Sequence, residues 1–318
     1  MHRIPHNRWH PRPEYLTAAQ RVISSGHVGP GPEVEALERE LAERFRRGDD
    51  CAVVSSGTAA LYLAIRVLGL ARVRMSTYNC TALLHAAQMA GADVELCDID
   101  PDSLNASRPV SLSVDTYGMP AATGTVHDFT WSPGANYRER TTGSLGDASV
   151  ISFAATKPLG VGMGGAVLGS KELIAEIRDI RDYDGKRSLR PRFNFSLGDV
   201  SAAMVRCRLS LLNEENEWRF EVATRYGQFS KLGQNGRYVF LVHPDELSIA
   251  RGHFESLGIE VINPLEPWEL LHNQLWLDPT RFPTAERASR ETLSLPIWVG
   301  MTEEEVSRVC RALETLEV

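Results

Sequence analysis

Short apolar runs alternate with amphipathic stretches over the first 180 residues, and this alternation most constrains the fold. Residues 51–56 (CAVVSS) resemble a buried strand, and residues 57–70 (GTAALYLAIRVLGL) a helix that begins at its Gly-Thr pair. Residues 32–49 repeat apolar side chains at helical spacing behind an initial proline. Strands that alternate with helices are typical of α/β proteins. The sequence therefore predicts an α/β fold whose central sheet is mostly parallel and flanked by helices.

The pattern changes after a long helical stretch at about residues 200–229. Glycine and polar residues at 231–237 (KLGQNGR) interrupt it, and a smaller α+β pattern follows. We therefore predict an N-terminal arm (1–30), a large α/β domain (31–230) and a small C-terminal α+β domain (231–318). Further strands are expected at 94–100, 110–115, 125–129, 150–155, 165–170, 238–244 and 258–263, and further helices up to Leu257 and at 302–316, the last with a capping box from Thr302 to Glu305.

Charge and composition exclude several classes of function. The formal net charge of -7 would repel a nucleic acid. No apolar run follows the basic N-terminus, so we expect neither a signal peptide nor a membrane anchor, and a cytoplasmic protein. Five scattered cysteines without a CxxC pair suit reduced thiols. No metal motif accompanies His2, His6 and His10, so we expect no metal and a polar, mobile arm.

Three features carry candidate chemistry. A strand end, a small-residue turn and a helix start meet at Ser56, Gly57 and Thr58, where unpaired backbone N–H groups can hold a phosphate or simply be capped. Asp128 ends an apolar strand, where a carboxylate needs a cationic partner such as a pyridinium. Lys157 follows the strand that holds Ser152 and precedes a glycine-rich turn, and a buried lysine there can form an imine. Together they match the needs of pyridoxal phosphate.

From about Gly29 onward the chain resembles the DegT-type sugar aminotransferases, a branch of the fold type I pyridoxal phosphate enzymes. The resemblance rests on stretches in the same order, among them GPGPEVEALERELAERF, VVSSGTAAL, TYGMPA, GSLGDASVISFAATKPLGVGMGGAVL and FNFSLGDVSAAM. It implies that Lys157 binds the cofactor covalently and Asp128 pairs with its ring nitrogen. It also implies phosphate binding by Ser56, Gly57, Thr58 and Ser152, and by Asn194 or Ser196 toward the neighbouring subunit, hence a homodimer with shared active sites.

The chain departs from the family pattern in three places. The residue two positions after Tyr78, usually an aromatic one over the cofactor ring, is Cys80, so Cys80, Tyr78 or His85 could cover the ring. Trp131 stands where the family commonly has Gln or His near the cofactor; it either borders the cofactor or only packs in a turn. The chain is also short between Asp100 and His127, where helices would normally cover the sheet.

The resemblance implies an aminotransferase that takes an amino group from an amino acid, glutamate in the family, and gives it to a keto-sugar or similar keto acceptor in polysaccharide or secondary-metabolite biosynthesis. In this scheme Lys157 moves the proton, and Asp128 keeps the ring nitrogen protonated. Two alternatives are dehydratase-like chemistry on the same scaffold and a non-catalytic regulatory protein that binds the cofactor. Sugar dehydratases of the family replace the lysine with histidine, so Lys157 favours transamination.

Overall fold

A five-stranded sheet forms the centre of the computed structural model, which describes residues 2–46, 48–227, 240–242 and 247–316. β4, β5 and β8 pair in parallel, and β9 pairs antiparallel with both β8 and β1. Every strand except β9 therefore runs in one direction, which confirms the predicted mostly parallel sheet. In spatial order the strands are β1 (Asp50–Val54), β9 (Gly165–Gly169), β8 (Ala148–Ser152), β5 (Val126–Asp128) and β4 (Leu112–Val114).

Helices cover both faces of the sheet because side chains alternate along its strands. In β1, Ala52 and Val54 join one apolar core, whereas Cys51 and Val53 join the core on the opposite face. The first core contains side chains of α3 (Gly57–Val67), α4 (Thr81–Met89) and α5 (Lys171–Ile180). The second contains those of α2 (Pro32–Phe45) and α6 (Asp199–Tyr226). These near-continuous apolar strands are typical of a sheet buried on both faces.

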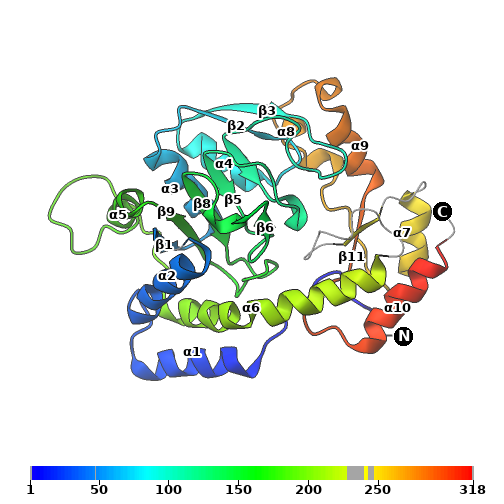
Figure 1. The fold of residues 1–318 in the computed structure, drawn as a ribbon, viewed down its shortest axis with the longest axis horizontal. Coiled ribbons are helices and arrows are strands. Elements are labelled where there is room, and N and C mark those ends of the chain that lie inside the picture. The colour runs from blue at the N-terminus through cyan, green and yellow to red at the C-terminus, as the bar shows by residue number, and fades with distance from the viewer. Residues whose placement is uncertain (1, 47, 228–239, 243–246, 317–318) are drawn as a thin grey trace.

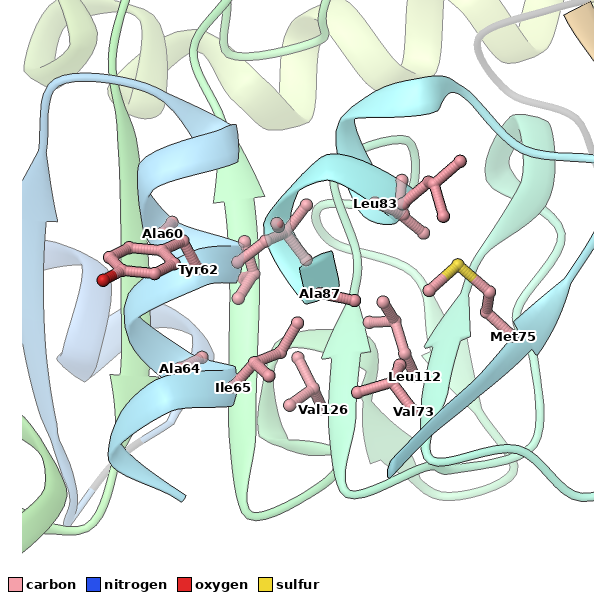
Figure 2. Close-up of a cluster of buried hydrophobic side chains, with 14 of the residues drawn as sticks. Ala60, Tyr62, Ala64, Ile65, Val73, Met75, Leu83, Ala87, Leu112 and Val126 are labelled. Carbon is pink, nitrogen blue, oxygen red and sulfur yellow. The ribbon is translucent and has the colours of Figure 1, made fainter. Parts of the chain in front are cut away.

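A parallel pair of strands that the sequence analysis did not predict as a pair extends the first core. β2 (Arg72–Ser76) pairs with β3 (Asp93–Cys97), and the backbone N–H of Ser111, next to β4, donates to the carbonyl of Arg74 at 3.1 Å. Figure 2 shows Val73 and Met75 of β2 in one cluster with Leu83 of α4 and Leu112 of β4. The apolar and basic residues of β2 alternate, as expected of a strand with one buried face.

The connections around β4 contain no α-helix, in agreement with the shortened region expected there. β3 reaches β4, and β4 reaches β5, through loops with a single 3-10 turn at Thr116–Gly118, although parallel strands are usually joined by helices. Buried side chains bond the backbone of these loops instead. The Ser113 hydroxyl accepts from the Gly124 N–H at 2.9 Å, and the Asp115 carboxylate accepts from the Ala121 N–H at 2.7 Å. The loop backbone is thus satisfied without a helix.

The same buried polar groups surround His127. Its Nδ1 lies 2.7 Å from the Ser113 hydroxyl, and its Nε2 lies 3.1 Å from an oxygen of Asp115. The Ser132 hydroxyl donates to the other oxygen of Asp115. This network fixes His127 directly before Asp128 in β5, so it holds the end of that strand in place.

The long helix α6 links two cores. It begins under the sheet and continues to the C-terminal elements (Figure 1), where Val222, Ala223 and Tyr226 are buried in a further apolar core. The helix confirms the long helical prediction, whereas the interruption at 231–237 lies outside the described residues. The C-terminal core also contains α7 (Leu247–Ser256), β11 (Leu293–Leu295) and α10 (Glu303–Glu314), and the predicted capping box at Thr302 and Glu305 is present. β10 (Phe240–Val242) pairs with β11.

The predicted strand at 258–263 is wrong. Only isolated bridges form there, from Ile259 to Ile4 and from Ile262 to Ser294. The two bridges join the segment to two different partners, so no continuous strand ladder forms. Pro264, which cannot donate a backbone hydrogen bond, follows directly.

The N-terminal arm is packed, which corrects the expectation of a polar, mobile segment. Ile4 is fully buried, and His6 Nε2 lies 2.8 Å from the Ser294 hydroxyl. Helix α1 (Pro13–Ser25) lies along α6 (Figure 1), with Tyr15, Ala18 and Val22 buried between neighbouring elements. Pro13 is the first residue of α1, a position that proline favours, so this proline starts the helix.

The segment after Pro264 returns to the sheet. The Asp98 carboxylate at the end of β3 accepts from the backbone N–H groups of Thr284 and Ala285, both at 2.9 Å, and so caps α9 (Pro283–Glu291). Phe282, Ala285 and Ala288 join the core around α3 and α4. The predicted division at residue 230 stays a prediction. The remaining strands are β6 (Asn136–Tyr137) and β7 (Arg140–Thr141), and the remaining α-helix is α8 (Leu271–Gln274). Among the described residues, no helix has the length and apolar character needed to span a membrane.

Candidate active site

Nine of the eleven predicted site residues line one cavity of about 370 Å³. This volume lies in the usual range of small-molecule sites, about 300–1,000 Å³. Asp128 and Ser152 are the last residues of the neighbouring strands β5 and β8, so the cavity lies at the carboxyl ends of parallel strands, where α/β proteins bind ligands. The nine residues are Ser56, Gly57, Thr58, Tyr78, Cys80, Asp128, Trp131, Ser152 and Lys157.

The start of α3 forms one wall of the cavity. The Ser56 hydroxyl caps the helix by accepting from the Ala59 N–H at 3.0 Å. A Cβ added to Gly57 would lie 2.7 Å from that of Ser152, so only glycine allows the helix to approach β8 this closely. The first turn of a helix presents backbone N–H groups and a positive dipole end, which together suit a phosphate. The structure shows Ser56 as the helix cap, and phosphate binding at this turn stays a prediction.

Asp128 is buried in the cavity wall. Burial raises the pKa of its carboxyl, while hydrogen bonds from Thr130 and the charge of Lys157 act in the opposite direction. The Thr130 N–H donates to the carboxylate at 2.9 Å, and the Thr130 hydroxyl accepts from the Ser152 N–H at 3.0 Å. A buried carboxylate of this kind gains from a cationic partner, which the expected pyridinium would be.

Lys157 lies in the turn after β8, which short backbone bonds hold in shape. The Lys157 N–H donates to the Ala154 carbonyl at 2.8 Å, and the Lys157 carbonyl accepts from the Gly160 N–H at 2.7 Å. Burial lowers the pKa of the Lys157 ammonium, and Cys80 and Asp128 act in the opposite direction. A lowered pKa increases the fraction of neutral amine, which is the nucleophilic form. Lys157 and Asp128 thus face one cavity with pKa values shifted in opposite senses.

Trp131 both lines the cavity and packs against its wall, and its contact with a cofactor stays a prediction. Its ring centroid lies 3.8 Å from Lys157 Nζ, and the indole lines the cavity. It also packs edge-to-face against Tyr117, with ring centroids 6.3 Å apart. The indole therefore borders the site while it packs in the wall, and its face stabilises the ammonium form of Lys157.

The candidates for covering a cofactor ring are reduced to two. His85 is exposed on α4 and does not line the cavity, whereas Tyr78 and Cys80 do. Tyr78 is fully buried, and burial raises the pKa of its hydroxyl. Cys80, the residue before α4, is exposed and lines the cavity.

Asn194 and Ser196 do not line this cavity. They lie in the segment between α5 and α6, where Asn194 is exposed and the Ser196 hydroxyl donates to Asp182 at 3.1 Å. The carbonyl of Phe195 between them accepts from the Ser55 N–H at 2.7 Å, which places the segment beside the start of α3. The predicted contact of Asn194 or Ser196 with the phosphate of the neighbouring subunit stays a prediction.

Thr130 and Tyr117 are among the cavity-lining residues that the sequence analysis missed. Thr130 links Asp128 to Ser152, and its position two residues after the aspartate was the available signal. Tyr117 lines the cavity with a positive φ of 50°, which is uncommon for a residue with a bulky side chain. Its place before Gly118 in the TYG stretch gave no hint of this conformation.

The residues present fit pyridoxal phosphate. A helix N-terminus with two hydroxyls suits the phosphate, a buried carboxylate suits the ring nitrogen, and an amine of lowered pKa suits the aldehyde. All three line the same cavity, through Ser56 and Thr58, Asp128, and Lys157.

Comparison with known proteins agrees with this geometry. The model of the DegT/DnrJ/EryC1/StrS aminotransferase family matches residues 11–110, 124–253 and 255–314. The dTDP-3-amino-3,4,6-trideoxy-alpha-D-glucose transaminase of Streptomyces venezuelae is 29% identical and covers 95% of this chain and 92% of its own length. The erythromycin biosynthesis sensory transduction protein EryC1 of Saccharopolyspora erythraea is 27% identical, with 93% of both chains covered.

Solved structures share the fold across the whole chain. The crystal structure of S. venezuelae DesV has a TM-score of 0.87 at 27% identity and covers 100% of both chains. The PLP-form of Spr1654 from Streptococcus pneumoniae has a TM-score of 0.88 at 18% identity, over 99% of this chain and 98% of that chain. The match to the family model, extending over most of the sequence, shows that the chain belongs to the DegT/DnrJ/EryC1/StrS aminotransferase family and is a pyridoxal phosphate-dependent enzyme.

Proposed function

We propose that this enzyme transfers an amino group from an amino acid donor, glutamate, to the keto carbon of a nucleotide-linked sugar in a biosynthetic route, and that it works in the cytoplasm. The S. venezuelae transaminase, named for a dTDP-amino sugar, supports the sugar acceptor. The observation that carries the proposal is the meeting of Lys157 and Asp128 in one cavity.

The bound cofactor supplies a conjugated ring that accepts the electron pair of the substrate carbon. The protein does the rest. Asp128 stabilises positive charge at the ring nitrogen, and the start of α3 holds the phosphate. Lys157, of lowered pKa, would take the proton from the substrate carbon that bears the amino group and deliver it to the former aldehyde carbon of the cofactor, because it stays in the cavity on a short, fixed turn.

Adding glutamate to the purified enzyme loaded with pyridoxal phosphate should bleach its yellow colour within one turnover, and a suitable keto-sugar nucleotide should restore it. The bound cofactor would carry the amino group from the donor to the acceptor. Absorbance follows both steps, and mass spectrometry of the product shows whether it gained nitrogen. Restored colour with a product that lost water and gained no nitrogen would instead favour dehydratase-like chemistry, and an unresponsive spectrum a regulatory role.

We further propose a homodimer in which Asn194 or Ser196 completes the phosphate site of the neighbouring subunit. The exposed Asn194 and its position outside its own cavity support this arrangement. Mixing inactive Lys157→Ala chains with weakened Asn194→Ala chains tests it. If the site is shared, each mixed dimer has one intact site, and random assembly restores about a quarter of wild-type activity. If Asn194 serves its own chain, no intact site forms and activity does not rise above that of the parents.

A further inference from the structure

A second, smaller pocket adjoins the cavity on the side of the N-terminal arm. We call it the arginine pocket, because its walls contain Arg8, Arg12, Arg208 and Arg219, with Glu215 beside them. Its volume of about 30 Å³ has room for about two water-sized groups. Lys157 and Trp131 line both the arginine pocket and the larger cavity, so the reactive amine lies at their boundary.

Positive charge exceeds negative charge in the arginine pocket. Arg208 and Arg219 share the carboxylate of Glu215, each at 3.3 Å. Arg12 pairs with Glu214 at 2.7 Å. Within the described part of the chain, Arg8 forms no ion pair, and its guanidinium lies 5.5 Å from the Trp298 ring centroid. The larger cavity has no arginine among its described lining residues. The arm side of Lys157 is therefore the side that attracts an anion.

The pocket is fixed relative to Lys157 through the Gly160 carbonyl. The Trp9 indole of the arm donates to this carbonyl at 3.1 Å, and Arg208 of α6 donates to it as well. Gly160 in turn donates its N–H to the Lys157 carbonyl at 2.7 Å. The arm, α6 and the turn that holds Lys157 thus meet at a single oxygen, which sets the position of the guanidinium groups with respect to the amine.

We infer that the arginine pocket binds the carboxylate of the amino donor, the one attached to the carbon that bears the amino group. This inference rests on the proposed aminotransferase function. That carbon must reach Lys157, so its carboxylate lies one bond away, and a carboxylate fits both the volume and the charge of the pocket. The diphosphate of a nucleotide sugar is separated from the keto carbon by a sugar ring, and it is too large for this space.

Arg8 is the guanidinium to test, because Arg208 and Arg219 are buried with Glu215 and their loss would threaten folding. Arg8→Gln is expected to raise the glutamate concentration for half-maximal bleaching about 10–100-fold, with Arg8→Lys in between. Arg3→Gln is the matched control: Arg3 is exposed on the same arm, pairs with Glu260 and does not line the pocket. The melting temperatures of all variants should stay close to that of the wild type.

A binding measurement makes the result independent of turnover. 2-Methylglutamate keeps the amine and the carboxylates but has no hydrogen on the reacting carbon, so it binds without completing the transfer. Calorimetry should show that the loaded wild-type enzyme and Arg3→Gln bind it and that Arg8→Gln binds it at least 10-fold more weakly. The inference would be overturned if the wild type and Arg8→Gln bind 2-methylglutamate equally, or if the wild type does not bind it. It would also be overturned if Arg8→Gln weakens binding of the keto-sugar alone. Normal binding without conversion of glutamate would instead count against the proposed function alone.

Discussion

Replacing Lys157 with alanine is expected to lower kcat by at least about 10⁴-fold. The substitution removes the only lysine among the described residues that line the cavity. Under the proposed function, Lys157 forms the covalent bond to the cofactor and moves the proton, so both would be lost. The visible absorbance band of the covalently bound cofactor should disappear, while equilibrium dialysis should still detect bound cofactor, because the start of α3 and Asp128 remain. Steady-state turnover and the absorption spectrum measure the two effects.

A chemical rescue separates this role from a structural one. Methylamine is small enough to enter the cavity left by the side chain and should restore part of the activity, increasingly so as pH rises and more of the amine is neutral. Lys171→Ala, at the start of α5, is the matched control and should behave as the wild type. Multiple turnover by Lys157→Ala without added amine would refute the assignment of Lys157.

Asp128→Asn is expected to lower kcat by about 10²–10³-fold, the cost of removing one preorganised charge from an active site. Asparagine has the same shape and keeps an acceptor oxygen for Thr130, so the cavity should be preserved. What is lost is the negative charge that, under the proposed function, stabilises a protonated ring nitrogen. Asp102→Asn, an exposed position in the loop after β3, is the control and should leave kcat unchanged.

The same substitution should stabilise the cofactor-free protein. Burial raises the pKa of the Asp128 carboxyl in the folded state above its unfolded value, so its contribution to stability is fully present below the unfolded pKa and is lost as pH rises through the folded pKa. The melting temperature of Asp128→Asn should therefore exceed that of the wild type at neutral pH, and the difference should shrink as pH falls. Added cofactor should stabilise the wild type more than the variant. A higher melting temperature for the cofactor-free wild type than for cofactor-free Asp128→Asn at neutral pH would contradict this account.

Much of the site could be predicted from sequence because its residues follow strand ends. Asp128 and Ser152 end neighbouring parallel strands, and Lys157 and the Ser56–Thr58 turn follow β8 and β1 closely, so sheet topology alone brings them together. Thr130 and Tyr117 could not be found in this way. Their roles depend on a hydrogen bond between two strand ends and on a backbone conformation, and neither leaves a periodic pattern.

Helices and strands that bury a continuous apolar face could be predicted from the sequence. Segments whose packing partners lie far away in the sequence could not. The arm shows the limit most clearly. Ile4 packs against a segment more than 250 residues away, and a single isoleucine among polar residues gives no sign of that contact. The strand predicted at 258–263 was wrong for a related reason. Its apolar residues contact two separate partners, and no single neighbouring strand pairs with the segment.

Helix α6 limits how the enzyme can open. Its first half is buried with Leu209 and Leu212 in the core under the sheet, and its last turns are buried with Val222 and Tyr226 in the C-terminal core. A hinge rotation of the C-terminal elements as one body would have to bend or unwind this continuous rod, which would break backbone hydrogen bonds in its middle. Cavity-lining segments outside this helix, such as the turn at Met163 and the stretch at Pro264–Leu265, are the ones that can move without bending it. The gating of this enzyme is a property of its loops, and its rate should respond to loop substitutions far more than to changes in the interface between the two cores.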